Sequence, residues 1–134
     1  MDELAATLAA DVELPSPLIG RATFKGRDDV RFLLGAVYEI LDYVTWEEPI
    51  GDGQSRLAVC HSSVGGLRID DAMLFELDHE GRIRRIRPHL RPWLALSVFA
   101  VMIVPKVARR PGVLWRAVRN APVHRAALAG RPQL

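Results

Sequence analysis

Cysteine and long hydrophobic runs are scarce in this 134-residue sequence. The single cysteine, Cys60, excludes an intrachain disulfide and fits a reducing compartment. The longest apolar run, residues 93–104 with Ser97 allowed, has 12 residues, whereas a membrane-spanning helix needs about 20. The chain starts with the acidic residues Asp2 and Glu3, unlike a basic secretory signal. We therefore expect a cytoplasmic protein.

Acidic residues are absent from the C-terminal part of the chain. All 16 acids lie within residues 1–80, beside six bases, whereas residues 81–134 hold 12 bases and no acid. The two parts therefore carry net charges of −10 and +12. This split indicates either a basic tail for an acidic partner or surface, or two parts of one fold that attract each other.

Motifs for metals, nucleotides and calcium are also missing. The four histidines and the cysteine do not have the spacing of metal ligands. The pair Gly65-Gly66 indicates a hairpin turn and not a phosphate-binding loop, and the turn that begins at Asp78 lacks the alternating ligands of a calcium loop. We expect no metal and no cofactor.

The periodicity of the sequence predicts one small α+β domain. Residues 2–10 favour a helix and residues 11–14 a short first strand, while residues 28–41 carry apolar side chains at helical spacing and predict a long helix. Strands are expected over residues 43–49, 55–63, 67–77 and 82–90. Four strands joined by short turns form an antiparallel meander, and we expect the helices to pack on one side of it.

Several short strings along residues 3–95 resemble SnoaL-like proteins of the nuclear transport factor 2-like superfamily in their order and spacing. They are Asp11-Val12, Ser16-Pro17, Phe24-x-Gly26-Arg27-Asp28, Val64-Gly65-Gly66, Asp78-x-x-Gly81-Arg82-Ile83 and Arg91-Pro92. The resemblance implies a cone in which a curved antiparallel sheet wraps around the long helix and encloses a pocket. The tail after Pro92 is longer and more basic than the resemblance implies, and from its charges and apolar residues we expect residues 1–104 to form the cone domain and residues 105–134 a basic, amphipathic helical extension.

Alternation of side chains along each strand separates a pocket face from an outer face. A tight hairpin at residues 78–81 would pair residue 77 with 82 and residue 75 with 84, and the resemblance assigns the more apolar face to the pocket. The predicted pocket residues are Trp46, Leu57, Val59, Met73, Phe75, Arg84, Ile86 and Leu90. We expect Asp70, on the other face, to pair with Arg87 or His89 across the strands.

Two pocket-side polar residues are the catalytic candidates. His61 could act as a general base or hydrogen-bond donor, and Asp71 would supply a second polar group at the rim. The alternatives are a histidine that is hydrogen-bonded beside the sheet and a solvated or salt-bridged carboxylate at its edge.

The family resemblance includes ketosteroid isomerases, polyketide cyclases, epoxide hydrolases and members that only bind a ligand. At the positions matching the two isomerase aspartates, this chain has Ser16 and Met73. Serine is no enolising base unaided and methionine donates no hydrogen bond, so that mechanism is not expected. We expect an apolar pocket for a small hydrophobic ligand such as a polyketide, steroid or lipid, and the sequence leaves catalysis open.

The alternative is a non-catalytic interaction module. Residues 93–104 are apolar all round, and we expect them to be buried within the subunit or in a homodimer. Residues 105–134 could dock on acids such as Glu3, Asp11, Glu47, Glu48 or Asp52, or lie on a membrane surface. Nucleic acid is disfavoured because this segment lacks interleaved aromatic residues.

Overall fold

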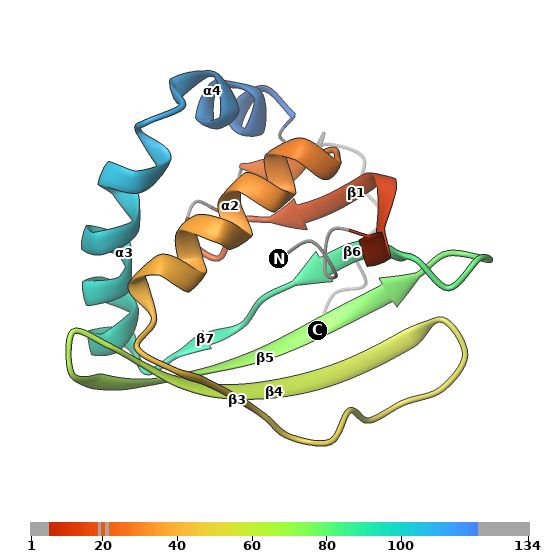
Figure 1. Cartoon of the computed structure of the whole chain (residues 1–134), viewed down its shortest axis with the longest axis horizontal. Helices are drawn as coiled ribbons and strands as arrows, with labels where there is room; N and C mark the ends of the chain where they lie inside the picture. The colour runs from red at the N-terminus through yellow and green to blue at the C-terminus, as the bar shows by residue number, and fades with distance from the viewer. Residues whose placement is uncertain (1–5, 19, 21, 121–134) are drawn as a thin grey trace, which may run out of the picture.

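A computed structural model describes residues 6–18, 20 and 22–120, in which three helices cover one side of a curved seven-stranded sheet (Figure 1). In chain order the elements are β1 (Leu8–Pro15), β2 (Thr23–Lys25), α2 (Arg27–Ile40), β3 (Val44–Trp46), β4 (Ser55–Val64), β5 (Leu67–Leu77), β6 (Ile83–Arg87), β7 (Leu90–Arg91), α3 (Trp93–Val107) and α4 (Pro111–Arg119). The strand order is β2-β1-β6-β5-β4-β3, and β7 pairs with β5. The predicted α+β class is confirmed.

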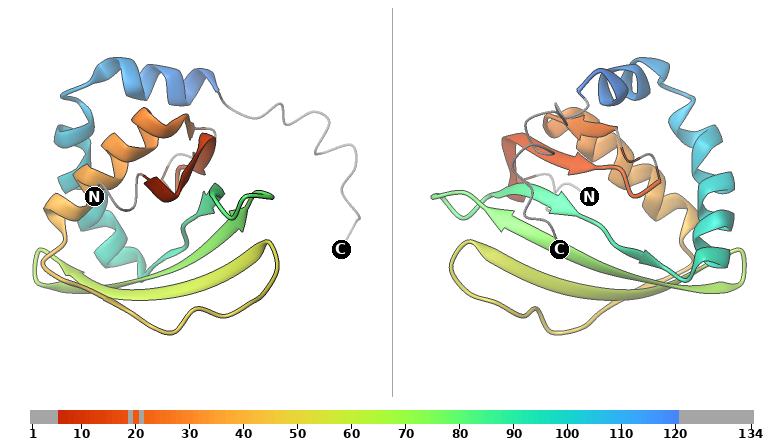
Figure 2. Two further views of the ribbon diagram at one scale, coloured as in Figure 1. Left: turned by 45° about the vertical axis from the view of Figure 1, so that its right-hand side comes forward. Right: turned by 180° about the vertical axis from the view of Figure 1, so that it is seen from behind.

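The predicted long helix is α2, which lies in the concavity of the sheet (Figure 2). Its apolar spacing buries one face, including Val30, Leu33 and Leu34, in the core. The acids Asp28 and Asp29 occupy the first turn, where the helix dipole favours negative charge.

The predicted meander is present in β4, β5 and β6, which are joined in antiparallel pairs. The β4–β5 turn places Gly65 and Gly66 at φ angles of 55° and 80°, in the left-handed region that favours glycine. This two-residue turn pairs Val64 with Leu67 and fixes the register of the longest hairpin in the described chain.

The N-terminal segment differs from the prediction. Residues 2–5 of the expected helix lie outside the described residues, and its last part, from Leu8 onward, is the start of β1. β1 pairs with β6 in parallel, with Leu8 opposite Ile83, so the sheet is mixed and not purely antiparallel. Leu8 and Val12 are completely buried, and this burial outweighs the local helix preference of the segment.

The β5–β6 hairpin also departs from the predicted register. Leu77 pairs with Ile83, one residue later than expected, and a bulge then makes Arg84 an extra residue before Arg85 pairs with Glu76. The two one-residue shifts add up to two residues, so Phe75 is opposite Ile86 and not Arg84, and because an even shift preserves the alternation both side chains keep the face predicted for them.

The two C-terminal helices pack on the core by one side each. α3 buries Ala95, Phe99 and Ile103 but leaves Trp93 and Val101 exposed, so the expectation that residues 93–104 are buried is wrong for the subunit. α3 continues to Val107, beyond residue 104 where the sequence suggests the cone domain to end.

α4 is held on α2 by ionic and aromatic contacts. The Arg116 guanidinium donates two hydrogen bonds, of 2.8 and 2.9 Å, to the buried Asp29 carboxylate, and Arg110 stacks over the Phe32 ring at 4.9 Å. Lys106 of α3 bonds Glu39 at 2.8 Å. These bases therefore meet acids of α2. Of the acids proposed from sequence, Glu3 lies outside the described residues, and none of Asp11, Glu47, Glu48 and Asp52 is an ion-pair partner of the bases after residue 104 that the structure describes.

Candidate functional site

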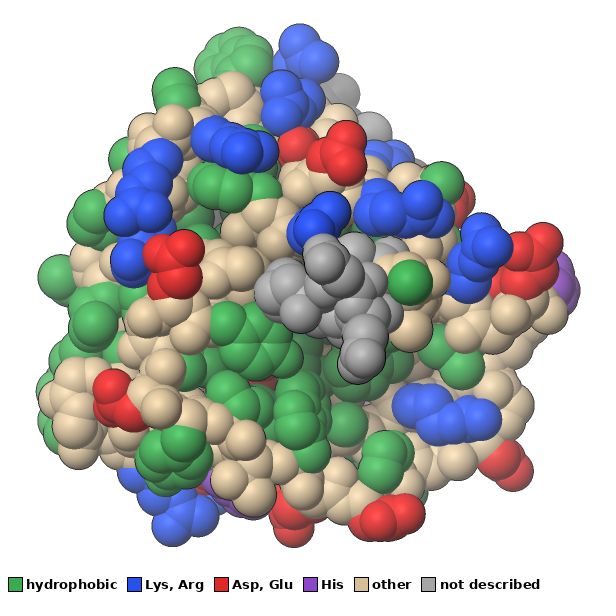
Figure 3. Space-filling view, viewed as in Figure 1, with side chains coloured by type: hydrophobic (Ala, Val, Ile, Leu, Met, Phe, Trp, Pro, Cys, Tyr) green, Lys and Arg blue, Asp and Glu red, His purple; other side chains and the backbone are tan. Residues whose placement is uncertain are grey.

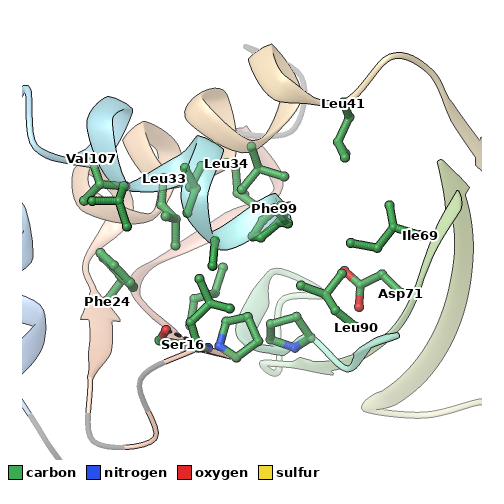
Figure 4. Close-up of a pocket in the computed structure, with 18 of the residues that line it drawn as sticks. Ser16, Phe24, Leu33, Leu34, Leu41, Ile69, Asp71, Leu90, Phe99 and Val107 are labelled. Carbon is green, nitrogen blue, oxygen red and sulfur yellow. Dashed lines mark hydrogen bonds between the residues drawn. The ribbon is translucent and has the colours of Figure 1, made fainter. Parts of the chain in front are cut away.

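A pocket of about 290 Å³ lies between the concave face of the sheet and helices α2 and α3 (Figure 4). This volume is close to the lower end of the range of about 300–1,000 Å³ that is common for small-molecule sites. Most of its lining is apolar: Leu14, Pro17, Leu18, Phe24, Leu33, Leu34, Val37, Leu41, Ile69, Met73, Pro88, Leu90, Phe99, Ala100, Ile103, Val104, Val107, Ala108 and Leu114. The pocket therefore suits a molecule with a mostly hydrophobic surface.

Four of the residues that line the pocket are also exposed to solvent. They are Pro17 after β1, Val104 and Ala108 at the end of α3, and Leu114 of α4. A side chain that lines a cavity and also meets solvent lies at its mouth. The mouth is therefore bounded by the loop after β1 and by the α3–α4 corner.

Asp71 is the one acidic residue in the pocket wall. It lies on β5, and its carboxylate points into the cavity between Ile69 and Leu90 (Figure 4). Its Oδ1 accepts a hydrogen bond of 2.9 Å from the backbone N–H of His89. Burial raises the pKa of Asp71 to about 6, against the lowering effect of the His89 N–H and of the His89 charge.

The other polar side chains of the pocket are neutral. Burial, followed by the charges of Asp71 and Asp70, raises the pKa of the Cys60 thiol to about 11. Ser62 donates its hydroxyl proton to the Tyr43 carbonyl, and Ser16 Oγ accepts a hydrogen bond of 3.2 Å from the Leu18 N–H. Asp71 is thus the group in this lining with a pKa near neutrality.

The structure places three of the predicted site residues in the pocket wall: Asp71, Met73 and Leu90. Phe75 and Ile86 share the face of Met73 but belong to the packed core beyond the cavity. Trp46 pairs with Cys60 and so lies on the same face, yet it is 44% exposed and outside the lining.

The prediction for β4 has the wrong face. Cys60 pairs with Asp71 and turns into the pocket, as does Ser62, so Leu57, Val59 and His61 point to the outer side of the sheet. The concave side carries small residues here, which leaves room for the cavity, whereas the sequence suggested the bulkier set.

Arg84 was also predicted for the pocket, but it lies outside the lining and forms an ion pair with Glu76 at 3.6 Å. Arg85 and Arg87 form ion pairs with the same carboxylate. The position of Arg84 follows from the bulge, which makes it the extra residue of β6. The lining residues that sequence reasoning missed come mainly from the end of β1 and the loop after it, from α2 and from α3, together with Cys60 and Ser62 of β4. The two-residue Gly65-Gly66 turn could have identified Cys60, because it sets residue 60 opposite residue 71.

His61 belongs to a polar network on the outer face and is not a pocket residue. Its Nδ1 is 2.7 Å from Asp70 Oδ1 and its Nε2 is 3.1 Å from Glu47 Oε2. The hydrogen bonds with Asp70 and then Glu47 raise the pKa of His61, because an imidazolium can donate to both carboxylates. The expected partners of Asp70, Arg87 and His89, are replaced by His61, with Arg68 at 3.5 Å and Arg91 at 3.8 Å.

The described residues contain no group of three or more His, Cys, Asp or Glu side chains placed to hold a metal ion. The reactive group of the pocket wall is one carboxyl in an apolar cavity, with neutral thiol and hydroxyl neighbours.

Known structures share this architecture. An uncharacterised protein from Silicibacter pomeroyi with a cystatin-like fold is 23% identical, with a TM-score of 0.80 over 87% of this chain and 83% of that chain. A steroid delta-isomerase from Pseudomonas aeruginosa is 20% identical, with a TM-score of 0.74 over 82% and 81%. A protein assigned as a SnoaL-like polyketide cyclase from Jannaschia sp. CCS1 is 12% identical, with a TM-score of 0.61 over 74% and 77%.

These likenesses show the fold alone. No protein-family model and no curated protein sequence matches the chain. The structural neighbours include steroid isomerases and polyketide cyclases, and the resemblance stated from sequence is thereby confirmed at the level of the nuclear transport factor 2-like fold.

Proposed function

We propose that this chain, which has the nuclear transport factor 2-like fold, binds a small apolar molecule in its pocket and exchanges a proton with it through Asp71. The observation that carries the proposal is a single carboxyl group, with a pKa near neutrality, in a cavity whose other walls are apolar or neutral. The ligand class is a polyketide, steroid or lipid-like molecule, because the lining offers mainly hydrophobic contact.

Asp71 is suited to act as a general base. With a pKa of about 6, roughly nine-tenths of the carboxyl is ionised at pH 7, and it is still basic enough to accept a proton from an acidic C–H group. The His89 N–H holds Oδ1 in place. A single base in a water-poor pocket can remove a proton at one carbon and return it at another, which isomerises the substrate without net loss of atoms.

The position of Asp71 supports this role. The resemblance to isomerases puts their protonated aspartate at Met73, and Asp71 lies on the same face of β5, two residues earlier in the strand. The steroid isomerase and polyketide cyclase neighbours have this fold. The proposal therefore uses a carboxyl at a new position in a pocket of the same kind.

Binding and chemistry can be tested separately. Native mass spectrometry of the purified chain should detect a co-purified apolar molecule. Ala100→Phe, which fills the pocket from α3, should abolish enhancement of anilinonaphthalene sulfonate fluorescence, whereas the matched variant Ala72→Phe on the outer sheet face should preserve it. Equal dye binding by both variants would refute the proposal that the ligand binds in this pocket.

The proton-transfer step has its own readout. A bound ligand incubated with the protein in D₂O should gain deuterium at an activated carbon, as measured by mass spectrometry of the extracted ligand. Asp71→Asn should retain the ligand but lose the exchange, because an amide does not accept the proton. If exchange persists at the wild-type rate in Asp71→Asn, the role of Asp71 in proton transfer is refuted, and only the proposal of ligand binding stands.

A further inference from the structure

The outer side of α3 is an exposed apolar stripe. Trp93, Leu94, Val101 and Val104 are 76%, 52%, 74% and 61% exposed, and their spacing puts them on one face of the helix, opposite the buried Phe99. Figure 3 shows hydrophobic side chains along the edge of the molecule where α3 lies. Side chains this large and this exposed, in a continuous row, mark an interaction surface.

The one polar side chain within this stripe is already hydrogen-bonded to its own helix. Ser97 donates its hydroxyl proton to the Trp93 carbonyl over 2.8 Å. Covering the stripe with an apolar environment therefore leaves no serine donor without a partner, and its desolvation is cheap.

α4 extends the same character around the corner. Val113 and Ala117 are buried on its inner side, while Leu114, Trp115 and Val118 are exposed on the outer side. Tryptophan is enriched where proteins meet the membrane–water interface, because its ring is apolar and its N–H is polar. The two helices carry one exposed tryptophan each, Trp93 and Trp115.

The charged side chains of α3, of α4 and of the residues that flank them are all basic, and two of them pair with acids of other elements, Arg91 with Asp70 and Arg109 with Glu39. Arg91 precedes α3, Arg109 and Arg110 form the α3–α4 corner, and Arg119 ends α4. The side chains of Arg91 and Arg109 are 81% and 63% exposed. No acid follows Glu80 in the sequence. Neither α3 nor α4 therefore carries an acid, and their exposed apolar side chains are flanked by arginines.

We propose that the outer faces of α3 and α4 dock on the surface of an anionic lipid bilayer. The acyl region takes the tryptophan, leucine and valine side chains, and the anionic headgroups take the flanking arginines. Charge complementarity favours this occupant over a second copy, whose identical face would bring arginines against arginines. Within the described residues no helix is long and apolar enough to cross a membrane, and the inner side of α3 is packed in the core, so the helices lie on the surface.

The docking face adjoins the pocket mouth. Val104 belongs both to the exposed stripe of α3 and to the pocket lining. Leu114 likewise belongs both to the exposed outer side of α4 and to the pocket lining. One consequence rests on the proposed function: an apolar ligand that binds in the pocket passes between the bilayer and the pocket at this corner without crossing bulk water. Binding to the bilayer itself does not depend on the pocket.

Vesicle sedimentation of the full chain tests the docking. At about 0.15 M salt, the wild type should sediment with phosphatidylcholine vesicles that contain phosphatidylglycerol and stay in solution with phosphatidylcholine alone. Val101→Asp should lower the partition coefficient about tenfold or more, and Arg119→Gln about fivefold. Ile50→Asp is the matched control, since Ile50 is 67% exposed in the β3–β4 connection and should leave binding unchanged.

Each other outcome overturns the proposal. Absence of sedimentation with anionic vesicles, or equal sedimentation of the wild type and Val101→Asp, excludes lipid docking through α3. Equal sedimentation with neutral vesicles excludes the role of the arginines. A homodimer that Val101→Asp converts into a monomer, without vesicle binding, assigns the face to a second copy. Dye binding in the pocket of Val101→Asp, measured alongside, separates failure of docking from failure of the proposed function.

Discussion

Replacing Asp71 by asparagine tests whether the pocket carboxyl is held at a cost to the folded state. Burial raises the pKa of Asp71 from its ordinary value of 3.8 to about 6. Each pKa unit corresponds to about 1.4 kcal/mol, so the ionised form destabilises the fold by about 3 kcal/mol relative to the unfolded chain.

The pH dependence follows from the sign of this change. Below about pH 4 the carboxyl is protonated in both states and contributes nothing. Between about pH 4 and 6 the folded state binds more protons than the unfolded state, so its contribution to stability falls as the pH rises, and above pH 6 the full cost is present. Asparagine has no such titration, and its side-chain oxygen can still accept the His89 N–H bond.

We therefore expect Asp71→Asn to unfold in urea with a free energy up to about 3 kcal/mol higher than the wild type at pH 8, with the difference vanishing near pH 4. Asp52→Asn, at an exposed loop position, is the matched variant that removes a carboxylate outside the pocket. Other titrating groups are common to both proteins and cancel. A pH-independent difference for Asp71→Asn, or its destabilisation at pH 8, would refute the reasoning about the buried carboxyl.

Three further predictions concern the fold. Gly51→Ala should destabilise the fold by about 1–3 kcal/mol in denaturant titration, because a Cβ at Gly51, where φ is +116°, would lie 2.6 Å from the Ser55 carbonyl oxygen. Gly35→Ala, in the middle of α2 where a Cβ meets open space, should stabilise the fold by about 0.5–1 kcal/mol. Ile86→Ala should cost about 2–5 kcal/mol and Leu57→Ala less than about 1 kcal/mol; similar losses would contradict the faces assigned to these strands. Arg116→Gln should accelerate amide hydrogen exchange in α4 but not in α2, since it releases the α4 contact with Asp29, and unchanged exchange would show that this pair does not hold α4.

The strands and the long helix could be predicted because their signals are local. Apolar spacing in residues 28–41 and turn residues such as Gly65 and Gly66 each act over a few positions. The strand predicted over residues 11–14 is part of β1, but the first residues of β1 could not be predicted in the same way, because Leu8 is extended through its pairing with β6 and its burial under α2. Tertiary contacts decided its conformation against the helix preference of the segment.

The pocket was predicted on β5 and missed on β4 for a definite reason. Hydrophobicity favoured Leu57 and Val59 for the inner face, but a cavity needs small side chains, and Cys60 and Ser62 supply them. Asp71 was identified because it shares a face with Met73. The position of α3 could not follow from composition, since an all-apolar helix gives no signal for which side meets the core.

The parallel pairing of β1 with β6 has a consequence for the order of folding. The β4–β5–β6 meander closes through short turns, whereas Glu13 of β1 meets Arg85 of β6 across 72 residues. Closing so long a loop costs chain entropy before any contact compensates for it, so the meander forms early and β1 joins it late. During synthesis, β1 leaves the ribosome first yet reaches its place only after β6 exists. Until then the edge of β6 has no partner strand, and this interval is when the chain is most prone to pair with another copy.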